Sequence, residues 1–389
     1  MRIILKPRTG GVFWGDGLFK MKSHFVEEFI IPVCTQVLTG NVTQIKGLPS
    51  YQPDEWDEIC EYASFHGLLA ILMSYVHTVK IKDEKCFEVV FSWYLTAVCD
   101  SQTAEQMSQT IEKLVRIMQR NNLDVMLLKG LCLAQYYPST QLRMSADIDF
   151  YLYGKQEEGL KALEREGVAC DDAWDYHAHA EMNGVRLELH QEFIDIDRVK
   201  TNEIVEKALV RLAEEEGKTC RCRWMGEDVT NAYRMTPTMN AIFLMRHMAI
   251  HFVSETVTLR MLYDWALFLY YEGNDVNWEK TRLLYDKVGM TDFARRILYI
   301  VIFRLGMPVA TCCPLEPLNG DGTDRLWNYI LHKEGNGLDY SSALKAGVMR
   351  RYELIKGKWK YDMVYPKDSF WKTFLYLAFR GVRTISERR

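Results

Sequence analysis

The hydrophobic pattern of this 389-residue chain changes its period twice, and this change limits the folds that it can adopt. From residue 22 to residue 121 the apolar side chains recur at helical spacing, as Leu114, Ile117 and Met118 do. Residues 122–230 contain short runs that alternate in polarity, which is typical of strands. Helical spacing returns over residues 231–389. We therefore predict an α+β fold, in which a small core with a mixed sheet is flanked by N-terminal and C-terminal helical regions.

The first region is predicted to hold three helical segments. They cover Ser23–Gly40, Pro53–Val76 with a break at His66-Gly67, and Phe87–Asn121 as one or two helices. Pro53 and Asp54 are the residue types that helix starts favour. Residues 1–21 are rich in glycine and lack helical periodicity, so we expect a flexible N-terminal tail.

The middle region is predicted to contain strands and two short helices. The helices are expected over Leu131–Tyr137 and Lys155–Glu166. The expected strands are Asp124–Lys129, Asp147–Tyr153, Tyr176–Met182, Val185–Glu192 and Thr219–Trp224. Asn183-Gly184 separates the third strand from the fourth and is a strong signal for a β-hairpin.

The last region is predicted to be a helical bundle followed by a basic, aromatic tail. Helices are expected from Pro237 to about Phe252 and over Arg260–Tyr271, Trp278–Val288 and Phe293–Leu305, with a loop over residues 308–325. The tail, residues 349–389, mixes lysine and arginine with aromatic side chains. It could face RNA, lie on a membrane surface or pack on the bundle as a terminal helix, which we favour.

Composition excludes several classes of protein. With 48 basic and 52 acidic residues the net charge is −4, so no chain-wide basic field favours nonspecific binding of nucleic acid. The longest apolar runs are far shorter than the ~18–20 residues of a membrane span, and the N-terminus lacks the apolar stretch of a secretory signal. The ten cysteines lack zinc-site spacing. We expect a cytoplasmic protein with reduced thiols and no zinc.

Two carboxylates on the second predicted strand carry the strongest chemical signal. Asp147 and Asp149 are two residues apart, so on a strand both side chains lie on the same face. Two like charges this close are costly unless a cation neutralises them. Mg²⁺ prefers oxygen ligands and usually takes one or two carboxylates together with substrate phosphates. The pair is therefore a candidate magnesium site, and a solvated pair is the alternative.

Residues just upstream of this pair are of types that bind phosphate. Lys129-Gly130 lies at a strand-to-helix turn, where glycine lets a phosphate approach the backbone and the following helix start favours an anion. Arg143 could hold a phosphate through two hydrogen bonds, and Ser145 directly precedes the acidic strand. The alternatives are an ordinary turn and a salt bridge from Arg143 to one of the two aspartates.

A third carboxylate lies in the predicted hairpin. In the strand that begins at Val185, Arg186, Glu188 and His190 face one way, while the leucines between them face the other. A carboxylate in the middle of such a strand either faces solvent or joins the acidic pair at a metal. We expect Glu188 to face the pair and His190 to orient an acceptor or to cap the acidic cluster.

Two further pairs lie at helical spacing in the C-terminal region. His247 and His251 are four residues apart and could bind zinc, but the glutamate of an HExxH motif is missing. Histidines that are hydrogen-bonded within the core are the favoured alternative. Arg260 and Asp264 are also four residues apart, and a helix ion pair of small energy is the alternative to a functional role for them.

Together these motifs resemble the polymerase-beta-type nucleotidyltransferase superfamily. The pattern is LLKG, then RMSADIDF about 12 residues later, then RLELH, and the resemblance is strongest over residues 122–193. It is most similar to a bacterial branch known only as nucleotidyltransferase family proteins, and it shares features with abortive-infection toxin nucleotidyltransferases. The chain departs from the superfamily in having Lys129-Gly130 where Gly-Ser is usual, and its gap to the acidic strand is slightly longer.

The resemblance implies a nucleotidyltransferase-like core that uses Mg²⁺, or Mn²⁺ in its place. Asp147, Asp149 and Glu188 would bind two ions and carry catalysis. A nucleoside monophosphate would move from an NTP such as ATP to a hydroxyl on a protein, a tRNA or a small molecule. The residues implied to contact the nucleotide or to line its pocket are Lys129, Gly130, Arg143, Ser145, His190, His247, Arg260 and Asp264.

Two other functions are compatible with the same residues. The metal site could serve phosphoryl transfer or phosphodiester hydrolysis, which would release different products. The fold could also be a non-catalytic module that binds NTP and metal without turnover. Three acids have no evident use in such a module, so we favour the enzyme.

Overall fold

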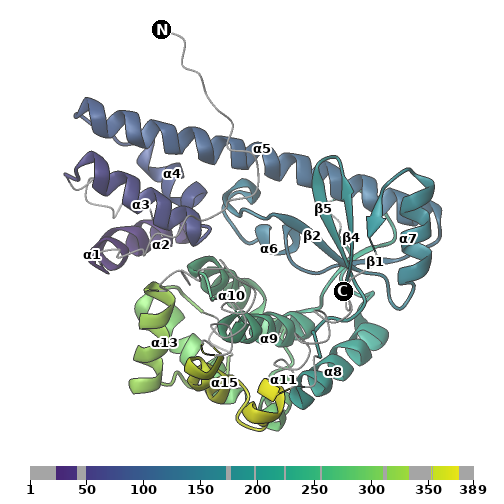
Figure 1. The fold of residues 1–389 in the computed structure, drawn as a ribbon. Coiled ribbons are helices and arrows are strands. Elements are labelled where there is room, and N and C mark those ends of the chain that lie inside the picture. The colour runs from purple at the N-terminus through teal and green to yellow at the C-terminus, as the bar shows by residue number, and fades with distance from the viewer. Residues whose placement is uncertain are drawn as a thin grey trace, which may run out of the picture.

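The computed structural model describes residues 23–41, 50–171, 177–196, 199–222, 225–254, 256–309, 313–332, 352 and 354–375. Within these residues the strands form a six-stranded mixed sheet in the order β3-β4-β5-β2-β1-β6 (Figure 1). The strands are β1 Val125–Leu127, β2 Asp147–Tyr151, β3 Cys170–Asp171, β4 His177–Met182, β5 Val185–His190 and β6 Ala232–Arg234. The α+β class and the mixed sheet between helical regions are confirmed.

Two parallel pairs give the sheet its mixed character. Strand β2 runs parallel to β5, and β1 runs parallel to β6, whereas the remaining neighbours are antiparallel. The β4–β5 hairpin closes at Asn183 and Gly184, whose φ angles are 54° and 72°. Both residues are left-handed, as a type I′ turn requires, so the predicted hairpin is confirmed.

The helices before the sheet follow the predicted pattern. They are α1 Ser23–Phe25, a π-helical segment Val26–Ile30, α2 Ile31–Thr39, α3 Pro53–Phe65, α4 Leu69–Val76 and α5 Glu84–Arg120. The Asp83 side chain accepts a hydrogen bond from the Cys86 amide and caps α5. The segment predicted as one or two helices is the single 37-residue helix α5.

Helix α5 takes part in two hydrophobic cores. Its first half, with Cys86 and Val90, packs into the core that joins the N-terminal helices to the C-terminal bundle. Its second half, with Leu114 and Met118, covers one face of the sheet and packs on Ile148. Figure 1 shows α5 running from the small N-terminal helices across to the sheet.

The remaining helices either connect strands of the sheet or follow the last strand, β6, in the sequence. They are α6 Leu131–Ala134, α7 Gln156–Arg165, α8 Lys200–Glu216, α9 Pro237–Ser254, α10 Leu259–Glu272, α11 Trp278–Val288, α12 Thr291–Tyr299, α13 Asp321–Leu331 and α15 Lys358–Val364, with a π-helical segment Ile300–Arg304 after α12. In the described part of the tail, Tyr361, Val364, Tyr365 and Phe370 are buried in the main core. This favours the packed terminal helix for that part.

Some of the sequence-based expectations were wrong. The expected strand over Thr219–Trp224 does not form in its described part, residues 219–222, because Arg221 makes only an isolated bridge to Tyr233, and the sheet edge is β6 instead. The loop expected over residues 308–325 ends at Asp321, where α13 begins. Helix α8 lies where we predict no element. The expected tail over residues 1–21 lies outside the described residues, and the three-region division of the chain stays a prediction.

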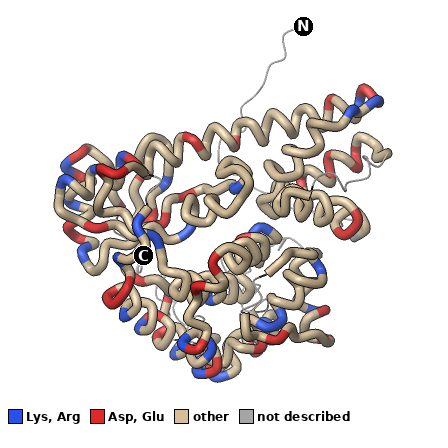
Figure 2. Tube along the Cα trace, turned by 180° about the vertical axis from the view of Figure 1, so that it is seen from behind, with Lys and Arg blue, Asp and Glu red and all other residues tan. Residues whose placement is uncertain are grey.

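Charges of both signs are interspersed over the surface. Figure 2 shows Lys and Arg near Asp and Glu along many of the helices, in keeping with the small net charge. Among the described residues, none of the helices combines the length and the apolar character needed to cross a bilayer.

A buried histidine joins the N-terminal helices to α10. The Nδ1 atom of His66 accepts a hydrogen bond from the Leu259 amide at 3.1 Å, and the His66 carbonyl accepts one from the Arg260 amide. Burial lowers the pKa of His66 from 6.5 to about 3. The neutral ring therefore accepts a hydrogen bond from a backbone amide at the start of α10 without placing a charge in the core.

This histidine should make stability depend on pH in acid. Because the folded-state pKa lies below the unfolded value, the contribution is complete above pH 6.5 and is lost as the pH falls toward 3. In His66→Gln the difference in unfolding free energy between pH 7 and pH 4 should shrink by about 3 kcal/mol. Urea titrations at both pH values measure it. The control is His332→Gln, at an exposed histidine. If the unfolding free energy changed equally between the two pH values in the wild type and both variants, His66 would not be the source of the pH dependence.

Candidate active site

The three predicted acids lie on one face of the sheet because β2 and β5 are parallel. In this register Asp147 pairs with Arg186 and Asp149 pairs with Glu188, so all four side chains share a face. Ile148 and Phe150 point to the opposite face and pack in the core beneath α5. The acids therefore look away from α5, toward the side of the sheet that carries the C-terminal helices.

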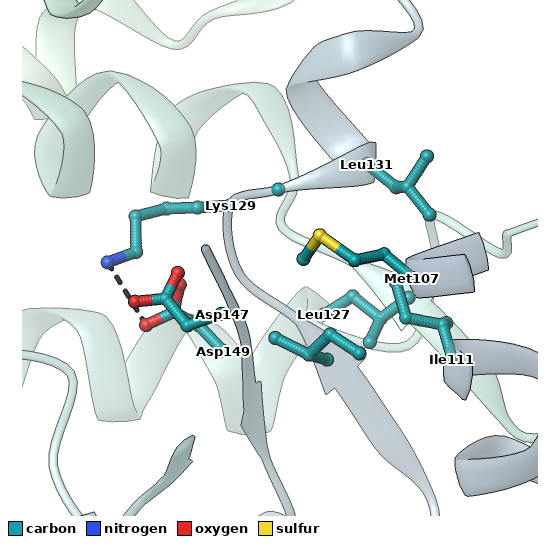
Figure 3. A pocket seen from close by; sticks show the side chains of 9 residues that line it. Met107, Ile111, Leu127, Lys129, Leu131, Asp147 and Asp149 are labelled. Carbon is teal, nitrogen blue, oxygen red and sulfur yellow. Dashed lines mark ion pairs between the residues drawn. The ribbon is translucent and has the colours of Figure 1, made fainter. Parts of the chain in front are cut away.

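Asp149 is the most deeply buried of the acids, with 4% of its surface exposed. Its Oδ1 atom lies 3.0 Å from the Lys129 ammonium and 2.9 Å from Nε2 of His190. Burial alone would raise the pKa of Asp149, but Lys129 and His190 together bring it well below its usual range. In Figure 3 the Lys129 ammonium points toward the carboxylates of Asp147 and Asp149. His190 thus caps the acidic cluster, one of its two expected roles.

The other two carboxylates repel the first. Burial and the neighbouring Asp149 raise the pKa of Asp147, and burial, Asp147 and Asp149 raise the pKa of Glu188. The ligand atoms of Asp149, Glu188 and His190 lie within 4.8 Å of one another. A divalent cation fits beside these groups, because their ligand atoms lie close together and the charge of the two carboxylates is only partly neutralised.

The turn before α6 depends on glycine. Gly130 has φ 52° and ψ −123°, a conformation that other residues rarely adopt. The Ser145 hydroxyl lies beside this turn and donates to the carbonyl of Asp147 at 3.3 Å. Helix α6 has only four residues, so its summed dipole is small, and the anion site expected at its N-terminus loses that support.

The structure places Arg143, the expected phosphate ligand, in a buried ion pair. Its guanidinium is buried and makes two hydrogen bonds to Asp264, at 2.8 and 2.9 Å, while Nη1 donates to the Gly130 carbonyl at 3.1 Å. The alternative partners, Asp147 and Asp149, are not the ones it takes. Asp264 also accepts from the Tyr137 hydroxyl at 2.8 Å. Arg143 and Asp264 are therefore a buried pair, and the Arg143 hydrogen bond to the Gly130 carbonyl fixes the glycine turn.

The alternative helix ion pair between Arg260 and Asp264 does not form, because Asp264 pairs with Arg143. Arg260 instead donates from Nη1 to the Met144 carbonyl at 2.6 Å, and its side chain packs against Gly67. Gly67 has φ 69°, and a Cβ there would lie 2.9 Å from the Arg260 Cδ atom. Arg260 thus holds the segment before β2, on which the acids depend.

The two histidines of α9 lie across from the acids. The His247 and His251 rings are 4.4 Å apart and perpendicular, and Phe243 stacks on His247. Burial and the positive charge of Lys129 lower the pKa of His247 well below its ordinary value. His247 is therefore a neutral ring near Lys129, compatible with the expected pocket wall.

A small pocket opens beside the glycine turn. It is lined by Lys129, Gly130, Asp147 and Asp149 on the polar side, and by apolar side chains of α5, β1, β2 and α6 on the other: Met107, Ile111, Leu127, Leu131 and Ile148. Figure 3 shows Met107 and Ile111 on the far side of the turn from the carboxylates.

Comparison with protein families now places the chain. The family model described as "Uncharacterised nucleotidyltransferase" matches residues 52–304, which is more than half of the sequence and includes every residue of the site. The chain belongs to this family. Searches of the curated proteins and of the solved structures give no match. Family membership supports nucleotidyl transfer as the general function, and the acidic and histidine group is one that could hold a metal.

Two further polar residues lie at the acids: Arg186, which the sequence places on the face of Glu188 without assigning it a role, and His179, which the sequence analysis does not single out. Arg186 lies 3.2 Å from Glu188, and His179 of β4 lies 3.7 Å from the same carboxylate. His179 is the register partner of Glu188. Counting outward from the Asn183-Gly184 turn would have placed His179 opposite Glu188.

Proposed function

We propose that this protein moves a nucleoside monophosphate from an NTP to a hydroxyl-bearing acceptor in a reaction that depends on Mg²⁺. The observation that carries the proposal is the parallel pairing of β2 with β5, which brings Asp147, Asp149 and Glu188 onto one face. The pairing joins residues about 40 positions apart in the sequence. The glycine turn with Lys129 follows β1 and lines a pocket together with Asp147 and Asp149.

Asp147, Asp149 and Glu188 are the residues that would hold the metal, since His190, the third member of the 4.8 Å group, is already hydrogen-bonded to Asp149. When bound, the ion would offset the negative charge of the acids and of the NTP phosphates. His190 keeps the Asp149 carboxylate oriented through its Nε2 contact. A carboxylate that is already fixed loses little freedom when it binds a ligand, which favours binding.

The chemistry that follows is an in-line displacement at the α-phosphorus. The acceptor oxygen forms a bond to this phosphorus while the bond to the bridging oxygen breaks, and pyrophosphate leaves with the bonding electrons. Glu188 takes the acceptor's proton and passes it to water. Lys129 stabilises charge on the transferred or the leaving group. The Lys129 side chain is 19% exposed, so part of it is accessible to a phosphate arriving from solvent.

Labelled substrates test this reaction class. The protein is incubated with each NTP labelled at the α- or at the γ-phosphorus, with Mg²⁺ or Mn²⁺ and a cell lysate as the source of acceptors. We expect the α label alone to move to an acceptor, with pyrophosphate released in equal amount. Movement of the γ label would indicate phosphoryl transfer instead. NTP binding that requires metal but gives no product would favour the non-catalytic module.

A further inference from the structure

Among the described residues, Arg186 is the most exposed of the cations near the acids. Lys129 and Arg260 also place positive charge near Asp147, but Lys129 is 19% exposed and paired with Asp149, and Arg260 is held by a backbone carbonyl. The Arg186 side chain is 58% exposed. It lies on the same face as Asp147, its register partner on β2. It is therefore the guanidinium that a ligand arriving from solvent would meet first.

The present partners of Arg186 are weak or shared. Its Nε atom lies 3.2 Å from Glu188 Oε1, and its guanidinium contacts the His179 ring at 3.1–3.3 Å. An exposed ion pair of this kind has little net energy. Glu188 is also one of the three groups whose ligand atoms converge within 4.8 Å. A cation bound there and Arg186 would therefore compete for the same carboxylate.

We propose that Arg186 binds the polyphosphate of the NTP and that metal binding releases it from Glu188 for this purpose. This inference rests on the proposed function and deepens it. A divalent cation at Glu188 repels the adjacent guanidinium and brings phosphate oxygens with it. The planar fork of arginine matches two phosphate oxygens better than a lysine does. Arg143, the arginine expected for this role, is unavailable because it is paired with Asp264.

Two binding measurements on Arg186→Ala separate this role from a structural one. Binding of Mn²⁺ alone, followed by its electron paramagnetic resonance signal, should become about threefold tighter, because a competitor for Glu188 is gone. Binding of inorganic tripolyphosphate with Mg²⁺, followed by calorimetry, should become at least about tenfold weaker. Arg186→Lys should bind tripolyphosphate with intermediate affinity. The control is Arg211→Ala, another exposed arginine in an ion pair, on α8, which should change neither affinity.

The two shifts are opposite in sign, which a misfolded variant could not produce. Weaker binding of both probes, or no change in either, overturns the role of Arg186. These results leave nucleotidyl transfer by the wild type intact, so failure of the inference is distinct from failure of the proposed function. Opposite shifts in a protein that transfers no nucleotidyl group would support Arg186 as a phosphate ligand and refute the transferase.

Discussion

Asp149→Asn should reduce nucleotidyl transfer by about 10³-fold, which corresponds to ~4 kcal/mol of transition-state stabilisation. The substitution keeps the shape of the side chain but removes the charge that Lys129, His190 and a metal share. Transfer of α label from the NTP to the acceptor, at saturating Mg²⁺, is the measurement. Mn²⁺ binding should weaken in parallel, because an amide is a poorer ligand than a carboxylate.

A matched variant separates loss of chemistry from loss of fold. Asp362→Asn removes one carboxylate from an exposed ion pair with Lys358 on α15, distant in sequence from the acids. It should transfer label at the wild-type rate. Both variants should keep the wild-type circular dichroism spectrum. Label transfer that survives in a folded Asp149→Asn would mean that the reaction takes place elsewhere on the protein.

Asp264→Asn should lower the free energy of unfolding by about 3–5 kcal/mol, because it leaves the buried Arg143 without a counter-charge. The side chains of the two residues are 4% and 7% exposed. Burial alone would raise the pKa of Asp264, yet Arg143 lowers it, so the carboxylate is charged in the folded protein. The urea midpoint, followed by circular dichroism, measures the change.

A second substitution should reverse part of this loss. Arg143→Met combined with Asp264→Asn removes the unpaired cation and leaves an amide oxygen for the Tyr137 hydroxyl, so the double variant should be more stable than Asp264→Asn alone. Asp292→Asn, in an exposed pair with Arg295, should not shift the midpoint measurably. If Asp264→Asn behaved like this exposed variant, Arg143 would have another buried partner.

The sequence predicts which side chains share a face within each strand of the site, while the pairing of β2 with β5 comes from the structure. Alternation places Asp147 and Asp149 together, and the Asn183-Gly184 turn fixes which residues of β5 share a face. Local periodicity carries this information, because side-chain direction in a strand depends only on the parity of the position. The same reasoning extends to His179, which the turn places opposite Glu188.

Contacts between distant segments were not predictable in this way. Arg143 finds Asp264 across 121 residues, and its type and position suit a phosphate as well as a carboxylate. Strand β6 has three residues and pairs with β1, which lies more than a hundred positions earlier. A three-residue strand is too short for alternation to be visible. Such contacts depend on how whole elements pack, and neighbouring residues do not encode them.

The long helix α5 has a consequence for how this protein loses its structure. Each core stabilises one half of the helix, and a helix of 37 residues is about 55 Å long. If one core melted, half of the helix would lose its packing and the other core would lose a rigid wall. We therefore expect a single cooperative thermal transition. A chain cut between residues 121 and 122 should not yield two independently folding fragments.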